Sequence, residues 1–270
     1  MIRIIVASNL WISLGAASFV LMHYVLGKKP LDFWYILFIF LTTFIAYNFQ
    51  RIVKLKKAEK EGKKELIDRL SWLQNHQIII WIFMMIAGVI SVYLFFYFQW
   101  HILPYLVVAS FLSLFYVVKI PLFSKPLREV PGLKIFLIAF SYGICTVLIP
   151  FYENPFQEQW WLFSACFFYL IAITIPFDIR DYEIDEKSIK TIPQLLGIRN
   201  AKLLALLLLI LSMCLYFFYS PFITWGILGL VTAFFIIGST TNNNSLWYGL
   251  GIDGLLIVGP ILLFTEVYLL

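Results

Sequence analysis

Hydrophobic residues along this chain occur in long unbroken runs, separated by short stretches that hold most of the charges. A helix that crosses the roughly 30 Å hydrocarbon core of a bilayer needs about 20 apolar residues. About nine runs approach that length, at residues 4–26, 32–50, 77–98, 101–119, 133–151, 159–177, 202–219, 222–239 and 247–268. Unbroken runs lack the alternation that a membrane barrel requires. The pattern therefore predicts an all-α integral membrane protein with about nine transmembrane helices in a single bundle.

Composition indicates the same class of protein. Of the 270 residues, 62% are hydrophobic and 13% are charged, and the mean hydropathy is +0.90, whereas a soluble domain is about 25% charged. The predicted helices use most of the chain, so we expect one polytopic membrane domain over residues 1–270, embedded in the lipid bilayer of the cell membrane. The net charge of +5 is not gathered in a separate basic domain, which argues against a nucleic-acid partner.

Lys and Arg are distributed unevenly among the loops. Of the 20 Lys and Arg residues, only Lys28 and Lys29 lie in a loop reached after an odd number of predicted spans. Short loops rich in Lys and Arg stay preferentially in the cytoplasm. We therefore predict a cytoplasmic amino terminus and a carboxyl terminus on the opposite side. The same rule places the longer polar loops, and any active face that they form, toward the cytoplasm.

The stretch PFDIRDYEIDEKSIKTIPQLLG, residues 176–197, concentrates carboxylates at the end of an apolar run. On a helix, Asp178, Asp181 and Asp185 would share one face, because residues at i, i+3 and i+7 do so. Like charges on one stripe repel each other unless a cation neutralises them. Mg²⁺ is a natural candidate, since it binds a few carboxylates together with phosphate oxygens. The alternative is a solvated charged loop, but the position beside a membrane span favours a functional site.

Two further loops on the predicted cytoplasmic side are basic. Residues 51–77 contain the amphipathic segment ELIDRLSWL, which is typical of an interfacial helix, although a solvated loop is the alternative. Residues 116–134 contain three prolines that interrupt any helix, and this loop is either a positive-inside anchor or a clasp over an anionic head group. The cations of the two loops considered for head-group binding are Arg51, Lys54, Lys119, Lys125 and Arg128.

A ligand suited to such a site has a polyanionic head and a long apolar tail. An isoprenoid diphosphate has both. Metal ions and cationic side chains stabilise the departing pyrophosphate, and a dry cavity protects the allylic cation from water. These features together predict transfer of an isoprenyl group inside the membrane.

The segment DIRDYEIDEKSIKTIPQLLG resembles the second aspartate-rich motif of the UbiA superfamily of intramembrane prenyltransferases, D-x-x-D-x-x-x-D followed by T-[LI]-P and L-G. The span count, the cytoplasmic site and a Y-x-x-x-x-P…K-P-x-R loop also agree with that family. The resemblance implies transfer from a polyprenyl diphosphate to an aromatic or lipidic acceptor, with Mg²⁺ as cofactor. The matching residues are Asp178, Asp181, Asp185, Thr191, Pro193, Leu196 and Gly197.

The resemblance, together with the position and charge of the polar residues, leads to an expected role for each of them. Asp178, Asp181 and Asp185 would hold Mg²⁺, and Asp181 and Asp185 are expected to be essential for catalysis. Asp253 lies inside the last predicted span, where an ionisable group is usually functional or paired, so we expect it near the acceptor pocket or in a structural hydrogen bond. The diphosphate would be held by Asn48, Arg51, Lys54, Lys119, Lys125, Arg128 and Lys190.

The family's first motif, N-x-x-x-D-x-x-x-D at the end of the second span, is altered in this chain. The segment AYNFQRIVKLKK keeps Asn48 but has Ile52 and Lys56 at the aspartate positions. One interpretation is a catalytically degenerate relative that binds an isoprenoid lipid or scaffolds a membrane complex. Another is that Arg51, Lys54 and Lys56 contact the diphosphate directly, in place of a bridging Mg²⁺. A transporter is a third hypothesis, but the predicted spans contain almost no ionisable residues to form an ion path.

Overall fold

The computed structural model is helical and contains no strand in the part of the chain that it describes. The described residues are 2–62, 70–98, 102–116, 118, 127, 130, 132–183, 190–220 and 222–269. The helices are α1 (Ile2–Ala7), α2 (Leu10–Leu26), α3 (Phe33–Glu61), α5 (Ser71–Asn75), α6 (Gln77–Tyr97), α7 (Leu103–Phe115), α8 (Leu133–Gly143), α9 (Phe156–Arg180), α10 (Ile192–Leu196), α11 (Ile198–Tyr219), α12 (Thr224–Gly238) and α13 (Leu255–Leu269). Two π-helical turns, η3 (Ile144–Leu148) and η4 (Trp247–Ile252), continue α8 and precede α13.

Each predicted apolar run coincides with a helix, or with a helix and an adjoining helical segment. Within the described ranges, five helices are long and apolar enough to cross a membrane, namely Phe33–Glu61, Gln77–Tyr97, Gln157–Arg180, Ile198–Tyr219 and Trp247–Leu269. Shorter apolar helices are Leu10–Leu26, Leu103–Phe115, Leu133–Leu148 and Thr224–Gly238. The all-α membrane prediction is therefore confirmed.

The helix α3 extends well past the predicted end of its apolar run at residue 50. It continues to Glu61 through a segment rich in Lys, Glu and Leu, which are strong helix formers. The basic segment that follows the span therefore begins as a straight continuation of a helix. Its far end forms α5, while the residues 63–69 between them lie outside the described part of the chain.

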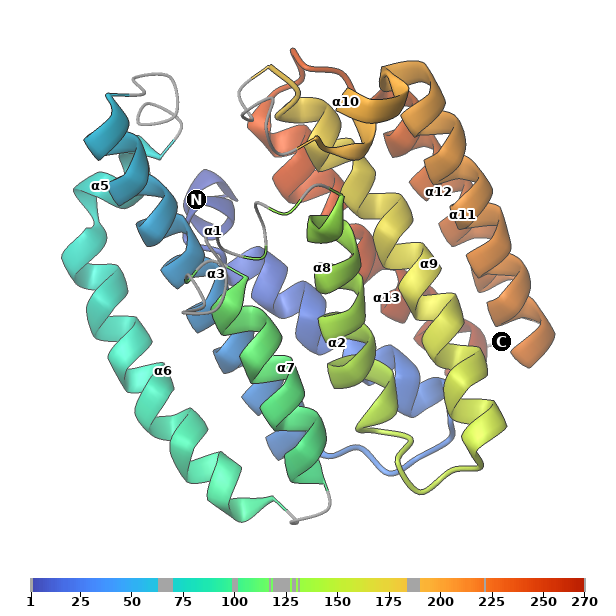
Figure 1. The fold of residues 1–270 in the computed structure, drawn as a ribbon. Helices are drawn as coiled ribbons and strands as arrows, with labels where there is room; N and C mark the ends of the chain where they lie inside the picture. Colours follow the sequence, from blue (N-terminus) through green and yellow to red (C-terminus); the bar gives the residue numbers. More distant parts are fainter. Residues whose placement is uncertain are drawn as a thin grey trace.

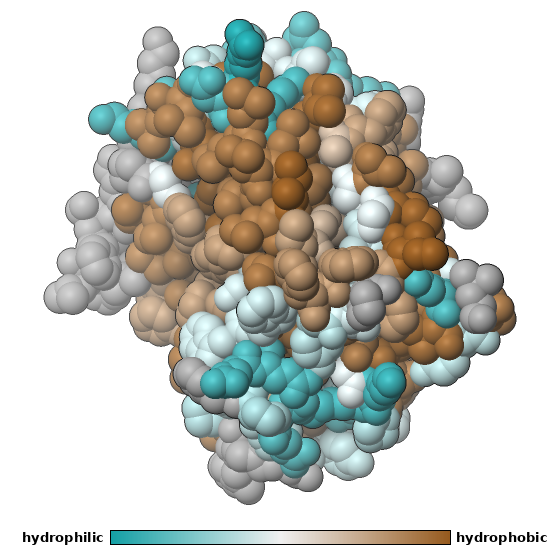
Figure 2. Space-filling model, turned by 90° about the vertical axis from the view of Figure 1, so that its right-hand side faces the viewer, coloured by the Kyte–Doolittle hydropathy of each residue, from teal (hydrophilic) through white to brown (hydrophobic). Residues whose placement is uncertain are grey.

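Large apolar side chains cover the outside of the bundle. On α6, Ile78 is 78% exposed, and on α11 and α12, Phe218 and Leu230 are each 76% exposed. Figure 2 shows the resulting apolar band on the face formed by α11 and α12, with hydrophilic residues gathered at both ends. Proteins in water rarely expose continuous apolar patches of this extent. The surface is that of a multi-pass membrane protein.

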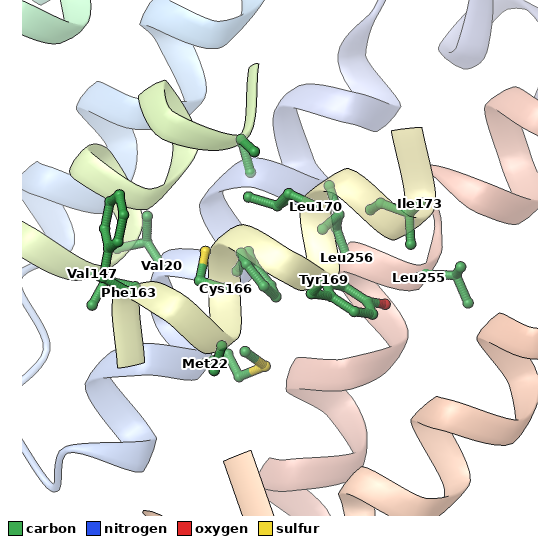
Figure 3. Close-up of a cluster of buried hydrophobic side chains, with 14 of the residues drawn as sticks. Val20, Met22, Val147, Phe163, Cys166, Tyr169, Leu170, Ile173, Leu255 and Leu256 are labelled. Atoms are coloured by element: carbon green, nitrogen blue, oxygen red, sulfur yellow. The ribbon is translucent and has the colours of Figure 1, made fainter. Parts of the chain in front are cut away.

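The helix α9 lies at the centre of the bundle, where it packs against α8, η3 and α11 (Figure 1). Its membrane-length segment is 78% buried, compared with 28% for α6. Cys166, Tyr169 and Leu170 of α9 lie among buried side chains of α2 and α13, including Met22 and Leu256 (Figure 3). The helix that carries the aspartate motif is therefore fixed on several sides.

The first predicted span is divided by a break between α1 and α2. Asn9 adopts a left-handed backbone, with φ 63° and ψ 12°. Asn48 of α3 fills the break, because its Nδ2 donates to the carbonyls of Ser8 at 3.0 Å and Phe44 at 2.9 Å. Its Oδ1 accepts a hydrogen bond from Asn9 Nδ2 at 2.9 Å. A broken helix in an apolar interior leaves carbonyls that need donors, and Asn48 supplies one.

We expect Asn48→Ala to lower the thermal stability of the purified protein in detergent. The change leaves buried polar groups of the break unsatisfied, at a cost of about 1–3 kcal/mol for each. The matched control is Ser91→Ala on α6, because the buried Ser91 hydroxyl has no hydrogen-bond partner among the described residues. Equal melting temperatures for the two variants would contradict a structural role for Asn48.

Candidate functional site

The charged ends of α3 and α9 lie at the same end of the bundle, where α5 and α10 are also found (Figure 1). Asp178 occupies the last turn of α9, and Asp181 directly follows the helix. The helix α9 ends at Arg180, and residues 181–183 form a turn. Asp178 and Asp181 are one helical turn apart and both buried. Asp185 lies outside the described residues.

Arg180 binds the carboxylate of Asp181 through two hydrogen bonds. Its Nε donates to Oδ1 at 2.8 Å and its Nη2 donates to Oδ2 at 2.9 Å. The guanidinium carbon lies 5.3 Å from the ring centroids of both Phe177 and Tyr248. Burial alone would raise the pKa of Asp181, but the Arg180 guanidinium outweighs it and holds that pKa well below its usual range. Asp181 is therefore an ionised carboxylate beside a stacked arginine.

Asp178 is paired with a lysine from a different helix. Lys134, in the first turn of α8, donates from Nζ to Asp178 Oδ1 at 2.5 Å. The Asp178 side chain is only 2% exposed and the Lys134 side chain 20%. Removing one partner of such a pair leaves an uncompensated buried charge, which is strongly destabilising. The pair therefore ties the start of α8 to the end of α9.

One stripe of α3 faces these groups. Tyr47, Arg51 and Lys54 are spaced at i, i+4 and i+7, which places them on one side of the helix. Lys54 interacts electrostatically with Asp181. Arg51 interacts electrostatically with Arg180 and donates from Nη1 to the carbonyl of Ala7 at 3.2 Å. The basic side of α3 is thus brought to the carboxylate end of α9.

The residues in the register of the family's first motif face elsewhere. Asn48 uses both amide donors on backbone carbonyls of the α1–α2 break and of α3. Ile52 is 2% exposed and packs in a small core between α3, α5 and α6 that includes Phe44 and Leu73. Lys56 is exposed. The described part of α3 therefore presents cations and a tyrosine to the site, and no carboxylate.

Asp253 lies at the junction of η4 and α13. A π-helical turn widens the helix just before it, and the Asp253 N–H donates to the carbonyl of Tyr248 at 3.0 Å. The partly buried carboxylate interacts electrostatically with Arg51 and Arg180. Among the described residues, no group donates a hydrogen bond to that carboxylate. Isolated π-helical turns occur frequently at functional sites, and this one aims an ionisable group into the bundle.

A tyrosine pair lies close to Asp253. The hydroxyl groups of Tyr47 on α3 and Tyr142 on α8 are 3.4 Å apart. Both tyrosines interact electrostatically with Asp253. The interior near the α9 carboxylates thus contains hydroxyls as well as charges, contributed by α3, α8 and the start of the last helix.

The remaining predicted residues have no described contact with the α9 carboxylates, or lie outside the described part of the chain. Lys190 is exposed in the segment before α10 and has a left-handed backbone, with φ 47°. The T-I-P-x-L-L-G segment forms α10, where the Thr191 N–H donates to Gln194 Oε1 at 3.0 Å. Gly197 has φ 78° and ψ 157°, a conformation that essentially only glycine adopts, and it turns the chain into α11. The predicted residues outside the described part of the chain are Lys119, Lys125 and Arg128, in addition to Asp185.

Sequence reasoning does not assign roles to Arg180, Lys134 or the Tyr47–Tyr142 pair. Arg180 stands inside the aspartate motif and directly precedes Asp181. This adjacency of opposite charges is the signal that the sequence contains. Lys134 begins an apolar run, as Asp178 ends one, and opposite charges at such positions are candidates for pairing. The tyrosines carry no comparable signal, because aromatic residues are abundant throughout the chain.

The donor set offers a hard cation two carboxylates, which it would bind in competition with Lys134 and Arg180. Asp178 and Asp181 offer two buried carboxylates one turn apart, and Mg²⁺ commonly binds one or two carboxylates and completes its shell with phosphate oxygens and water. Within the described residues, no group of three or more His, Cys, Asp or Glu side chains could hold a metal ion. The described part of α3 offers no carboxylate for a second ion.

Comparison with known proteins identifies the family of this chain. Residues 73–249 match the UbiA prenyltransferase family, so the chain belongs to that family. The match begins beyond α3, and the altered first motif therefore lies outside it. A search of curated proteins gives no match.

Solved structures share the fold. A UbiA homolog from Archaeoglobus fulgidus bound to GPP and Mg²⁺ has 14% sequence identity and a TM-score of 0.60, covering 97% of this chain and 99% of that chain. A structure of digeranylgeranylglyceryl phosphate synthase has 12% identity and a TM-score of 0.59, covering 100% of both chains. A structure of a UbiA homolog from Archaeoglobus fulgidus bound to Cd²⁺ has 13% identity and a TM-score of 0.56, covering 96% of this chain and 99% of that chain. At these identities the likeness establishes the fold alone.

We expect Ile52→Asp to destabilise the protein without creating a metal site. The substitution restores an aspartate at the motif position, but it places an unpaired charge in the core between α3, α5 and α6, at a cost of roughly 3 kcal/mol or more. Thermal unfolding with and without Mg²⁺ measures both effects, and Ile52→Val, with a cost of about 1 kcal/mol, is the control. Greater Mg²⁺-dependent stabilisation than in the unmodified protein would contradict the orientation of α3.

Proposed function

We propose that this protein transfers an isoprenyl group from a polyprenyl diphosphate to a lipidic or aromatic acceptor, with Mg²⁺ as cofactor. The observation that carries the proposal is the buried pair Asp178 and Asp181, which faces cations from α3 and α8 inside a fold of the UbiA family. A buried site with both carboxylates and fixed cations suits a ligand that is a metal-bound polyanion.

The proposal gives a role to each residue of the candidate site. Asp178 and Asp181, together with Asp185, hold Mg²⁺, which when bound neutralises charge on the departing pyrophosphate. Arg51, Lys54 and Lys134 bind phosphate oxygens, and we assign Lys119, Lys125, Arg128 and Lys190 to the same head group. Asn48 supports the site by fixing α3 to the α1–α2 break, since it donates to the Ser8 carbonyl and accepts a hydrogen bond from Asn9 there.

The reaction exchanges one bond for another. The bond between the first prenyl carbon and the diphosphate oxygen breaks, and its electron pair leaves with pyrophosphate. The prenyl carbon then bonds to a nucleophilic atom of the acceptor, which loses a proton. Fixed cations favour the departure because they are already oriented toward the developing charge. The apolar bundle excludes water, which would otherwise quench the prenyl cation.

Asp253 marks the acceptor side of the site in this proposal. Its carboxylate lies near the cations that would bind the head group, yet no described group donates a hydrogen bond to it. A buried acceptor of hydrogen bonds is satisfied by a ligand that brings a donor. An acceptor molecule with a hydroxyl group meets that requirement.

The proposed topology has about nine membrane spans in one domain, with the amino terminus and the active face toward the cytoplasm. The distribution of Lys and Arg supports this orientation, since 18 of the 20 lie on one predicted side. The aspartate end of α9 and the end of α3 lie together at one end of the bundle, which is consistent with one active face.

A catalytically degenerate relative is the second candidate function. The observation that favours it is the absence of carboxylates from the site-facing stripe of α3 among the described residues. Such a protein would bind an isoprenoid lipid or diphosphate, or scaffold a membrane complex, and would release no pyrophosphate.

The deciding experiment is product formation from radiolabelled farnesyl or geranylgeranyl diphosphate, with Mg²⁺ and an extract of the protein's own membrane lipids. We expect a prenylated lipid, and we expect Asp181→Asn to slow its formation by at least about 100-fold, because it removes charge from the metal and diphosphate site. Glu183→Gln, at an exposed carboxylate two residues away, is the matched control and should leave the rate unchanged. Binding of the diphosphate without product would favour the degenerate relative.

We expect Asp253→Ala to slow product formation by about 10-fold or more while leaving the affinity for prenyl diphosphate unchanged or higher. The reason is that Asp253 would contact the acceptor, whereas its removal takes a negative charge away from the neighbourhood of Arg51 and Arg180 and so does not weaken their attraction for phosphate. Turnover and diphosphate binding measured on the same preparation separate the two effects. A parallel loss of both would place Asp253 in the structural framework instead.

A further inference from the structure

The side of α3 that faces the α9 carboxylates is basic, because it carries Arg51 and Lys54. We infer that Arg51 and Lys54 act as fixed cations in place of a second metal ion, so that a prenyl diphosphate binds together with one divalent cation held on the α9 side. This inference rests on the proposed function, and it names how the same site recognises its diphosphate.

The register of α3 is the first support. Successive residues of a helix are turned by about 100° about its axis, so a side chain one position along the helix points in a clearly different direction. Arg51 and Lys54 face α9, whereas Ile52 packs toward α5 and α6 and Lys56 is exposed. The motif positions therefore do not point to the site, and the stripe that does so carries positive charge.

The fixed position of Arg51 is the second support. One of its terminal nitrogens donates to the Ala7 carbonyl at 3.2 Å, at the end of α1 where the helix is broken. A guanidinium has five N–H donors in a rigid plane, so this bond orients the group and leaves other donors for phosphate oxygens. An arginine held in this way can bind phosphate with little loss of side-chain freedom.

The proximity of like charges is the third support. Arg51 and Arg180 lie within electrostatic range of each other, and only Asp253 is a carboxylate partner common to both among the described residues. Both guanidinium groups are partly buried, and Arg180 is already paired with Asp181, so Arg51 is the cation whose charge a bound anion would balance. A diphosphate, with about three negative charges at neutral pH, supplies such an anion.

The net charge of the site explains why two cationic side chains can take the place of a metal ion together with its carboxylate ligands. A Mg²⁺ ion held by two aspartates adds no net charge to the site. Arg51 and Lys54 add two positive charges, which Asp253 offsets in part. The attraction for a diphosphate is therefore retained without a second ion, while geometry is provided by the directional donors of Arg51.

The test counts metal ions bound with an inert substrate analogue. Purified full-length protein in detergent is saturated with farnesyl thiodiphosphate, whose sulfur bridge resists cleavage, and titrated with Mn²⁺. Electron paramagnetic resonance of the remaining free Mn²⁺ then gives the number of bound ions. We expect one Mn²⁺ per protein in the presence of the analogue, and two bound ions would overturn the inference.

Variants of α3 provide the second measurement. We expect Arg51→Gln to weaken binding of the analogue by about 10- to 100-fold, as for loss of a charged hydrogen bond, with the Mn²⁺ count unchanged. Lys54→Gln, which leaves the bond to Ala7 intact, tests the same point if Arg51→Gln fails to fold. Lys56→Gln is the matched control on the exposed side of α3 and should bind the analogue as the unmodified protein does.

The possible failures are distinguishable. If the analogue binds but neither Arg51→Gln nor Lys54→Gln weakens it, the inference is wrong while the proposed function stands. If Asp178→Asn and Asp181→Asn leave the Mn²⁺ count at one, the ion is not on α9 and the inference is also overturned. If the analogue does not bind the unmodified protein at all, the proposed function fails and the inference fails with it.

Discussion

Charges buried in a membrane protein need partners, and this requirement organises the end of the bundle where α9 terminates. Asp178 is bound by Lys134 of α8, and Asp181 by Arg180, which is itself packed on two aromatic rings. Each pair would be unstable if one member were lost, because a single charge in an apolar interior has no water to compensate it. The ends of α8 and α9 are thus joined by charge pairing in addition to the apolar core lower in the bundle.

The helices could be predicted from the sequence because the thickness of the bilayer imposes their length. Every apolar run coincides with a helical segment, and the class of protein follows from that agreement. The break at Asn9 could not be predicted in the same way. It lies inside an apolar run, and it is held by Asn48, far along the chain, which donates to the Ser8 carbonyl and accepts a hydrogen bond from Asn9. The continuation of α3 to Glu61 was also missed, since hydropathy reports where a span ends and not where a helix ends.

The candidate site could be predicted in part. Spacing and position single out Asp178 and Asp181, and the structure brings cations of α3 and α8 to them, although their roles in binding await experiment. The pairing of Lys134 with Asp178 depends on tertiary packing, so the sequence marks both as charges at the ends of apolar runs but does not show that they meet, and the tyrosines carry no local signal. The face of α3 is the clearest case. The motif register suggests Asn48 and Ile52, whereas the packing of α3 against α5 and α6 turns Arg51 and Lys54 toward α9.

The bond between Arg51 and the carbonyl of Ala7 has a practical consequence for handling the protein. The helix α1 supports the candidate site, because the carbonyl of its last residue, Ala7, holds the Arg51 guanidinium. An affinity tag or fluorescent protein fused at the amino terminus is joined close to that contact, because α1 is a single short helix that ends at Ala7. Low activity in an amino-terminally tagged preparation would therefore say little about the chemistry of the untagged chain.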